Sequence, residues 1–416
     1  MESKNQGYKH TELGWLPEGW EVRELGELVD KQRPISYGIV QTGDPVSKGI
    51  KCVRVTDIDE GKICENDLIT TSKEISNRYR RTILKKGDVV LALRGKIGSS
   101  AIVGDSMAGA NLTRGVALIS QSDNLSSKFV HQWLSSPIGS KELESRLNGS
   151  ALKEISIGVL RMLPFPLPPL SEQRAIADLL GCWDRAIGAM GELIRQKQAR
   201  KKWLMQVLLN GKRRLPGFAG EWKRVKLGEV FQEVRTQNDG NANATMTISA
   251  RHGLITQGEK FDRIIAGNSL PSYTLIEKGD FAYNKGNSKL YQMGCIYLLE
   301  EAPSALVPFV YICFRPRKGK ASANFYKHWF INHGLDRQLK KIITSGARGD
   351  GLLNVARDDF FALRLPVPSL EEQEAIGKVL QACGSECLLL ETKLAMLQLQ
   401  KKGLMQILLS GRIRLV

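Results

Sequence analysis

The stretch that decides the fold is written twice in this chain. It reads PLPPLSEQRAIADLL from Pro166 and LPVPSLEEQEAIGKVL from Leu365. Gln173 in the first copy lies over Gln373 in the second, at an offset of 200 residues. Self-similarity at a fixed offset is the mark of an internal repeat, so we expect two structurally equivalent halves.

Each copy of this stretch predicts the start of one long helix. The match resumes where KKWLMQVLLNGKRRL from Lys201 lies over KKGLMQILLSGRIRL from Lys401, so neither copy has gained or lost a residue in between. The paired prolines and Ser171 predict the helix start, with Ser171 as N-cap, and Gly211 after Asn210 predicts its end. The predicted helix has about 38 residues and is roughly 57 Å long.

One narrow apolar stripe runs along each predicted helix. Its steps alternate between four and three residues, which is the period of a coiled coil, and in the first copy they lapse at Lys197 and Lys201. Two such stripes in one chain can bury each other, and we expect the helices to pair antiparallel, since that arrangement is compatible with an approximate twofold axis between the halves. The predicted seam residues are Ile176, Leu180, Trp183, Ile187, Met190, Ile194, Leu204, Leu208, Ile376, Leu380, Cys383, Cys387, Leu390, Leu394, Leu397, Leu404 and Leu408.

The segments between the helices also repeat, more faintly. GWEVRELGEL from Gly19 resembles EWKRVKLGEV from Glu221, and TILKKGDVV from Thr82 resembles TLIEKGDFA from Thr274. Strand patterns follow: VVLALRG and SAIVG in the first block, and GCIYLL and VYICF in the second. The longest apolar run, SALVPFVYICF from Ser304, is short enough to be a buried strand. The fold class we expect is α+β, with two similar α/β domains separated and joined by two long helices in an antiparallel coiled coil. The expected boundaries are 1–165 and 215–365 for the domains, 166–214 for the central helix and 366–416 for the C-terminal helix.

Glycine-rich turns are expected at the end of each globular block. They are NGS from Asn148 and TSGARGDG from Thr344.

Composition favours a cytoplasmic protein that binds a polyanion. The 416 residues carry a formal net charge of +17, and there is no run of 18 apolar residues and no apolar leader segment. A basic excess attracts nucleic acid most often, although solvated lysines alone account for part of it.

The residues that could carry chemistry form no recognisable catalytic or metal motif. There is no P-loop and no HExxH, and the chain lacks both the glycine-rich cofactor loop and the Asn/Asp-Pro-Pro-aromatic tetrapeptide of an adenine methyltransferase. Asp57, Glu60 and Lys62 in VTDIDEGK resemble a nuclease triple, but such triples are frequent by chance. The seven cysteines predict free thiols, and Cys383 and Cys387 fit the apolar stripe better than a metal site. We therefore expect no catalytic residue, no metal and no cofactor in this chain.

The five histidines show no spacing typical of metal ligands. His328 and His333, five residues apart, are expected on a solvated or half-buried helix surface.

Taken together, the repeated LPEGWEVRELGEL and KKGDVV patterns and the doubled P-x-L-x-E-Q-x-A-I helix start resemble the specificity subunit of type I restriction-modification systems, over essentially the whole chain. The resemblance implies that each globular block is a target recognition domain reading one half of an asymmetric bipartite DNA sequence. It also implies that the two helices set the spacing and dock two methyltransferase subunits, and through them restriction subunits. S-adenosylmethionine would then bind the methyltransferase, and ATP and Mg the restriction subunit.

Base reading in the major groove needs Arg, Asn or Gln at base edges, while other cations contact phosphates. Basic residues next to turns are the candidates, although each taken alone is more often a solvated charge. The predicted DNA-binding residues are Arg78, Arg80, Arg81, Arg94, Lys96 and Arg114 in the first block, and Arg251, His252, Lys285, Lys289 and Arg348 in the second.

Two other classes stay open at this point. A stand-alone bipartite DNA-binding regulator would bind its site without partners, and a purely structural coiled-coil scaffold would leave the charge of +17 without a use.

Overall fold

The computed structural model describes residues 7–147, 153–238, 244–261, 267–286, 290–343 and 353–415. It divides into two compact units. Unit 1 is Met1–Gly191 with Thr392–Val416, and unit 2 is Glu192–Glu391. Each unit therefore joins one globular domain to half of each long helix. Both predicted glycine turns, from Asn148 and from Thr344, lie largely or wholly outside the described residues.

Unit 1 is built on small, mostly antiparallel sheets. One has the strand order β10-β9-β12-β4 and another the order β11-β5-β8, in which β11 and β5 are parallel. Its strands are β1 (Tyr8–Thr11), β2 (Gly14–Pro17), β3 (Glu21–Glu24), β4 (Ser36–Tyr37), β5 (Ile50–Val53), β6 (Ile58–Asp59), β7 (Lys62–Ile63), β8 (Ile69–Thr71), β9 (Val89–Ala92), β10 (Ser100–Ile102), β11 (Asn111–Leu112), β12 (Val116–Ile119) and β13 (Pro164–Leu167). Its short helices are α1 (Leu25–Leu28), α2 (Lys73–Arg78), α3 (Ser127–Leu134), α4 (Pro137–Glu144) and α5 (Ile157–Arg161).

Unit 2 repeats this plan with its own strands. Its main sheet has the order β15-β22-β19-β20 and is antiparallel throughout. The strands are β14 (Lys223–Lys226), β15 (Phe231–Val234), β16 (Met246–Ser249), β17 (Gly253–Thr256), β18 (Thr274–Glu277), β19 (Phe281–Asn284), β20 (Cys295–Leu298), β21 (Ser304–Val307), β22 (Ile312–Pro316) and β23 (Arg364–Val367). The short helices are α7 (Leu227–Val230), α8 (Gln257–Phe261), α9 (Ala323–Ile331), α10 (Asp336–Ile342) and α11 (Arg357–Ala362).

One apolar run in unit 2 holds two strands. The predicted strand VYICF overlaps β22, while SALVPFVYICF as a whole is not a single strand but contains both β21 and β22. Pro308 follows β21 directly, and a turn closed by Tyr311 N–H donating to the Pro308 carbonyl separates the strands. Each strand then pairs with a different partner, β21 with β18 and β22 with β15 and β19.

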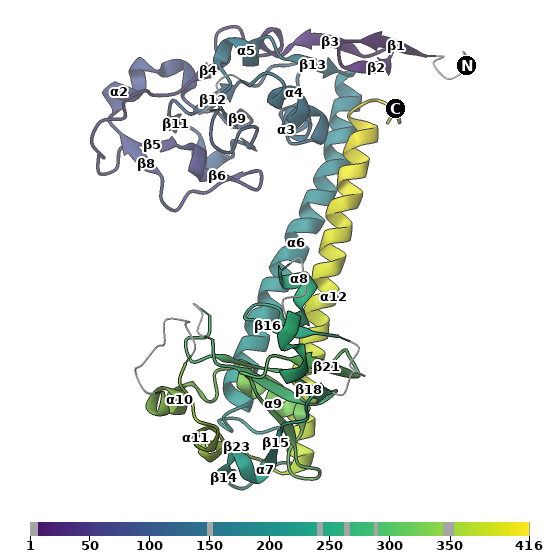
Figure 1. Cartoon of the computed structure of the whole chain (residues 1–416). Coiled ribbons are helices and arrows are strands. Elements are labelled where there is room, and N and C mark those ends of the chain that lie inside the picture. Colours follow the sequence, from purple (N-terminus) through teal and green to yellow (C-terminus); the bar gives the residue numbers. More distant parts are fainter. Residues whose placement is uncertain are drawn as a thin grey trace. The chain divides into compact units, whose positions relative to one another are not determined.

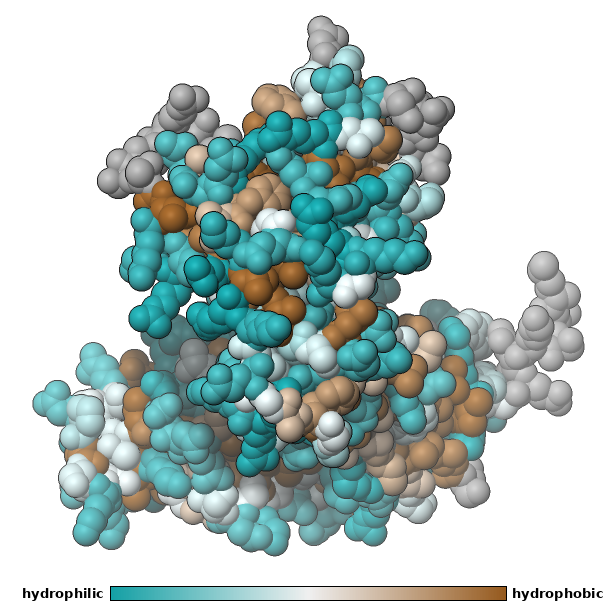
Figure 2. All heavy atoms as spheres, turned by 90° about the horizontal axis from the view of Figure 1, so that it is seen from below, coloured by the Kyte–Doolittle hydropathy of each residue, from teal (hydrophilic) through white to brown (hydrophobic). Residues whose placement is uncertain are grey.

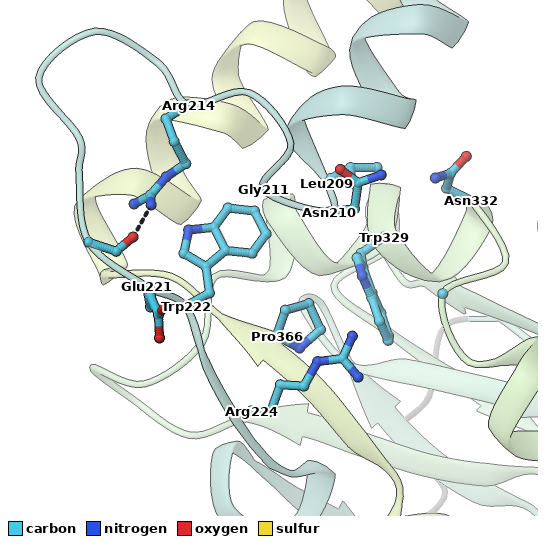
Figure 3. Close-up of a pocket in the computed structure, with 12 residues that line it drawn as sticks. Leu209, Asn210, Gly211, Arg214, Glu221, Trp222, Arg224, Trp329, Asn332 and Pro366 are labelled. Carbon is cyan, nitrogen blue, oxygen red and sulfur yellow. Dashed lines mark hydrogen bonds between the residues drawn. The ribbon is translucent and has the colours of Figure 1, made fainter.

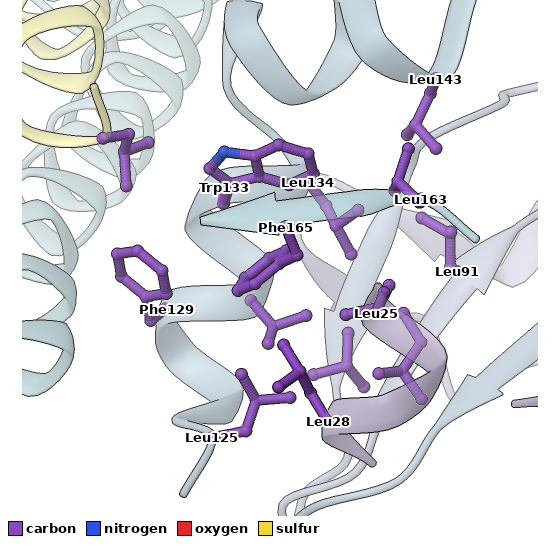
Figure 4. Close-up of a cluster of buried hydrophobic side chains, with 14 of the residues drawn as sticks. Leu25, Leu28, Leu91, Leu125, Phe129, Trp133, Leu134, Leu143, Leu163 and Phe165 are labelled. Atoms are coloured by element: carbon purple, nitrogen blue, oxygen red, sulfur yellow. The ribbon is translucent and has the colours of Figure 1, made fainter. Parts of the chain in front are cut away.

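The core of unit 1 gathers side chains from sheet, short helices and long helices (Figure 4). Helix α3 begins at the N-cap Ser126, whose Oγ accepts a hydrogen bond from the N–H of Phe129. Its apolar face buries Phe129 and Trp133 against Phe165 of β13, with ring centroids 5.8 and 4.9 Å from that of Phe165. Such edge-to-face contacts add specificity to the area that the rings bury.

The repeated KGD motif is a turn in which only the aspartate is buried. Gly87 has φ of 88° and Gly279 φ of 97°, a left-handed conformation that favours glycine. Asp88 and Asp280 are almost fully buried, and each accepts a backbone N–H from the residue three positions earlier. Each carboxylate also binds an arginine through two hydrogen bonds, Arg33 for Asp88 and Arg315 for Asp280. The motif therefore serves the fold, because a buried carboxylate needs such partners.

The two long helices are α6 (Leu170–Leu208) and α12 (Leu370–Leu408), of 39 residues each, and they pack antiparallel (Figure 1). Ser171 is not the N-cap but lies inside α6. The carbonyl of Pro169 accepts the N–H of Gln173, which places the cap two residues earlier than predicted.

The predicted seam coincides with a continuous line of burial. All of the predicted seam residues are buried or half-buried, whereas most of the positions between them are exposed. The stripe continues through its polar lapse, because Lys197 and Lys201 are also half-buried. Lys197 Nζ lies 2.5 Å from Glu386 Oε1, so an ion pair stands there in place of apolar contact.

The doubled Glu-Gln pair of the helix start joins each helix to its domain. In unit 1, buried Glu172 accepts Trp20 Nε1 at 3.0 Å and binds Arg414 at 2.6 and 2.7 Å. In unit 2, buried Glu372 accepts Trp222 Nε1 at 3.0 Å and binds Arg214 at 2.5 and 2.6 Å. We call each set the glutamate joint of its unit.

The glutamine that follows each glutamate makes a second set of bonds. Gln173 Oε1 accepts the N–H of Ser126, the N-cap of α3, and its amide donates to the Pro168 carbonyl. Gln373 does the same to Ser322, at the start of α9, and to Pro368. The sequence that is written twice therefore forms the hydrogen-bonded junction between helix and domain.

Candidate nucleic-acid interface

An arginine-lined hollow of about 810 Å³ opens in the domain of unit 1. Arg54, Arg94, Arg114 and Lys153 line it, together with Glu154 and uncharged side chains. We call it the arginine hollow.

Arg94 and Arg114 have fixed backbones and exposed side chains. Arg94 follows β9 and pairs with Glu154 in an antiparallel bridge, and the N–H of Arg114 donates to the Ile39 carbonyl at 2.9 Å. Within the described part of the chain, neither guanidinium makes an ion pair. An anchored backbone with a free guanidinium is suited to bidentate binding of a guanine edge or a phosphate.

Arg54 lines the same hollow but is bound internally, and the sequence analysis did not select it. Its guanidinium donates to both Asp57 carboxylate oxygens and to the Asp67 carbonyl. Hydrogen bonding to Asp57 raises the pKa of Arg54 further. Since Asp57 is committed to this pair, it is not available for the nuclease triple that VTDIDEGK resembles.

Lys96 is tied to a neighbouring hairpin. Its Nζ lies 2.6 Å from Asp59 Oδ1, and that hydrogen bond raises the pKa of Lys96. Both side chains are more than half exposed, so the pair is weak and can open when a polyanion approaches.

A second hollow, of about 620 Å³, gathers the other predicted cations of unit 1. Arg78, Arg80 and Arg81 line it, with Arg161 and exposed Tyr37, which the sequence analysis missed. Arg161 donates twice to the Ile35 carbonyl, so it acts partly as a structural clamp. Arg78, Arg80 and Arg81 lie within four residues of one another, so the sequence alone shows them as a cluster. Arg161 comes 80 residues after Arg81, and only folding brings it to this hollow.

In unit 2, Arg251 and His252 are exposed in the turn between β16 and β17. The turn is held by Tyr297, whose hydroxyl donates to the Ala250 carbonyl at 2.8 Å. Gly253, at φ of 79°, packs against the same ring.

Lys285 follows β19 and is half-buried. Burial, together with nearby Arg357, lowers the pKa of its ammonium. The Lys285 carbonyl accepts the N–H of Leu353, as the Leu93 carbonyl accepts that of Ile155 in unit 1. Lys289 and Arg348 lie outside the described residues.

The two histidines predicted on a helix surface differ from each other. His328 is buried on α9, its Nε2 has no hydrogen-bond partner, and burial lowers its pKa to about 4. His333 lies beyond the end of α9, stacks on Tyr291 and bonds Asp336. The expectation of a solvated or half-buried surface is therefore wrong for His328.

The described ranges of the chain contain no cluster of three or more His, Cys, Asp or Glu side chains that could hold a metal, and no helix among them is long and apolar enough to cross a membrane. All seven cysteines are free. The face in Figure 2 is mostly hydrophilic, with apolar side chains in small separate patches.

Comparisons with known proteins agree on one family. The family model described as "Type I restriction modification DNA specificity domain" matches residues 17–196. The specificity subunit of the type I restriction enzyme EcoBI of Escherichia coli is 36% identical over 39% of this chain, and that match spans only 34% of the subunit's own length. The putative MjaX specificity subunit of Methanocaldococcus jannaschii is 26% identical over 99% of this chain and 97% of its own.

Among solved structures, the HsdS subunit from Thermoanaerobacter tengcongensis is similar in fold. The two share a TM-score of 0.51 at 20% identity, over 96% of this chain and 98% of that one.

Proposed function

Because the chain belongs to the family of type I restriction-modification DNA specificity subunits, we propose that it reads an asymmetric bipartite DNA target, one domain for each half. In this proposal residues 1–165 and 215–365 are the target recognition domains, and residues 166–214 and 366–416 hold the helices that set their spacing. The observation that carries it is the arginine hollow, where Arg94 and Arg114 combine anchored backbones with free guanidinium groups.

The chemistry of these side chains supports DNA reading in unit 1. A guanidinium held by its backbone can bind guanine O6 and N7 together, and each good bidentate contact discriminates by about 1–3 kcal/mol. Arg78, Arg80 and Arg81 in the second hollow would contact phosphates, which position the protein without reading sequence. Lys96 would join them once its exposed pair with Asp59 opens.

The reading residues of unit 2 are of a different kind. Arg251 and His252 are presented on a turn, and half-buried Lys285 is set at a strand end. Lys289 and Arg348 belong to the same proposed set by sequence alone. Since cation type and backbone context differ between the units, the two half-sites should differ as well.

The proposed partners follow from the family. Two methyltransferase subunits would dock on this chain, restriction subunits would join through them, and S-adenosylmethionine, ATP and Mg would bind those partners. This chain would contribute recognition and no catalytic group.

The test is to express the chain with its cognate methyltransferase and to sequence the methylated adenines in the cell's DNA. The expected result is one split, non-palindromic motif that disappears when this chain is omitted. Methylation without a split motif, or a palindromic one, would contradict the proposal. Tight binding of a split site by the purified chain alone would instead identify a stand-alone regulator.

A further inference from the structure

A hairpin covers the end of α12 in unit 1. Strands β1 and β2 pair from Tyr8 to Pro17, and the Tyr8 hydroxyl donates to the Gly411 carbonyl at 3.1 Å. Leu16 is 2% exposed. A Cβ added at Gly411 would lie 2.4 Å from Cδ of Pro17, so the proline is packed directly on this glycine. The hairpin thus places Pro17 on the helix end, and Leu16 belongs to the same buried core cluster as Trp20.

Unit 2 has the equivalent surface without the hairpin. Gly211 follows α6 as Gly411 follows α12, and its Cα faces the ring of Trp222, 3.3 Å from where a Cβ would stand. A hollow of about 630 Å³ lies there, bounded by Trp222 beside Gly211 and by Trp329 and Pro366 opposite (Figure 3). We call it the empty seat.

The chain that links α6 to β14 lines the empty seat with Arg214 and Gly220 but places no proline there. Residues 211–222 are all described, and Pro216, the proline in this link, is exposed. With Trp222 laid over Trp20, half-buried Phe218 stands where unit 1 has Leu16, and exposed Ala219 stands where it has buried Pro17. The result is visible in the two indoles: Trp20 is fully buried, whereas Trp222 is only half-buried although it makes the same bond to its glutamate.

We propose that the empty seat binds an extended segment of a protein partner that presents an apolar residue, a proline and an acidic residue in succession. Unit 1 supplies the pattern for this ligand, because Pro17 of its own Leu16-Pro17-Glu18 packs on Gly411, the equivalent of Gly211. Aromatic-lined grooves suit proline, since its ring packs on indole and its fixed backbone loses little entropy on binding.

The rim of the empty seat supplies the charge for this ligand. Arg224 lines it and is exposed, where unit 1 has Val22. Its guanidinium makes no ion pair among the residues that the structure describes, and it can therefore pair with an acidic residue beside the proline. The volume suits a short peptide segment rather than a folded domain.

The test uses the full chain and a fluorescein-labelled peptide LGWLPE, which copies Leu13–Glu18. Anisotropy should show saturable binding with a Kd on the order of 100 µM, weakened at least about tenfold when the peptide's proline is alanine. Asn332→Phe, which fills the hollow, and Arg224→Glu, which reverses the rim charge, should each weaken binding by a similar factor. Lys223→Glu is the matched control on the same strand and outside the hollow, and it should change nothing.

Three results would overturn the proposal. One is the absence of saturation up to about 2 mM peptide. Another is binding that tolerates both Arg224→Glu and the proline-to-alanine peptide, which keeps the test decisive even if Asn332→Phe fails to fold. The third is a dimer of the full chain, seen by sedimentation, that Asn332→Phe dissociates, because the seat would then belong to a second copy.

Discussion

The glutamate joints of the two units are nearly identical, and the strand ends that face the proposed DNA are not. Both joints use one tryptophan and one arginine on a buried carboxylate, at distances that agree within 0.1 Å bond for bond. At the strand end, by contrast, unit 1 carries exposed Arg94 and unit 2 half-buried Lys285. A buried carboxylate loses both partners' bonds if it is replaced, whereas an exposed cation can be exchanged without disturbing its neighbours. The joints are therefore a structural part that the two units share, whereas the proposed DNA-reading residues differ between them.

The largest expected effect comes from lengthening the two long helices, α6 and α12. Four residues inserted after Ile194 in α6 and four after Leu390 in α12 should add roughly 6 Å to both helices, which is on the order of one to two base pairs of B-DNA. The methylated motif should keep both half-sites, and the gap between them should lengthen by about one to two base pairs. Sequencing methylated adenines from cells that carry the variant with its methyltransferase measures this.

A matched control inserts four residues after exposed Lys318, in a surface turn, and should leave the gap unchanged. An unaltered gap in the helix variant would show that the helices do not set the spacing.

Breaking one joint should destabilise one unit. Glu372→Gln leaves Arg214 without its buried carboxylate and should lower the free energy of unfolding of unit 2 by about 3 kcal/mol. Denaturant unfolding followed by tryptophan fluorescence measures it. Glu371→Gln, on the exposed neighbouring residue, is the control, and a loss of equal size there would discredit the role of the joint.

Replacing a proposed DNA-reading residue should alter DNA binding and leave the fold unchanged. Arg94→Ala should weaken DNA binding by about 1–3 kcal/mol and relax specificity in one half-site only. Titration of the assembled methyltransferase complex with DNA targets that carry single base changes measures both the affinity and the specificity at each position. Lys86→Ala removes a cation of the same domain that is paired with Asp105, and it should have little effect. Equal relaxation in both half-sites would rule out one domain per half-site.

The smallest effect concerns His328, whose place in unit 1 is taken by Gln132. Burial holds the pKa of His328 at about 4, below the usual value near 6.5, so the unfolded state takes up a proton first as the pH falls. Stability should therefore be full above pH 6.5 and fall by about 1–2 kcal/mol by pH 5. His328→Gln should remove that part of the slope. Denaturant unfolding at pH 7.5 and at pH 5 compares the stability of the native chain with that of the His328→Gln variant. If both lose the same free energy of unfolding between these pH values, the burial of His328 does not contribute to the pH dependence.

Sequence patterns predicted the long helices because an apolar stripe with a coiled-coil period, kept at one offset in two copies, fits few structures besides a helix pair. They did not predict β13 and β23, since proline-rich runs argue against strands. Both strands belong to two-stranded sheets, so each has a neighbour on one side only. Pro164 and Pro166 have no N–H to donate, and a strand with one neighbour tolerates this because no second strand needs that hydrogen bond. The cap was misplaced at Ser171 because serine is a favoured N-cap residue, whereas α6 already begins at Leu170 and the Pro169 carbonyl accepts the N–H of Gln173.

The candidate site was predicted from basic residues next to turns, and only part of it could be found in this way. Arg94 and Arg114 belong to different loops, and both line the arginine hollow. Arg54 and Arg161 were missed because their role depends on partners that folding supplies, the Asp57 carboxylate and the Ile35 carbonyl. Which guanidinium is free is a property of the fold and not of the local sequence.

The division of unit 1 into two stretches of chain sets an order of assembly during synthesis. Residues 192–391 are contiguous, so all of unit 2 has been synthesised before the second stretch of unit 1 begins. Until Arg414 is made, Glu172 has only Trp20 as a partner, although it was synthesised 242 residues earlier. Domains usually fold from the N-terminus onward. Here the half that is begun first is finished last.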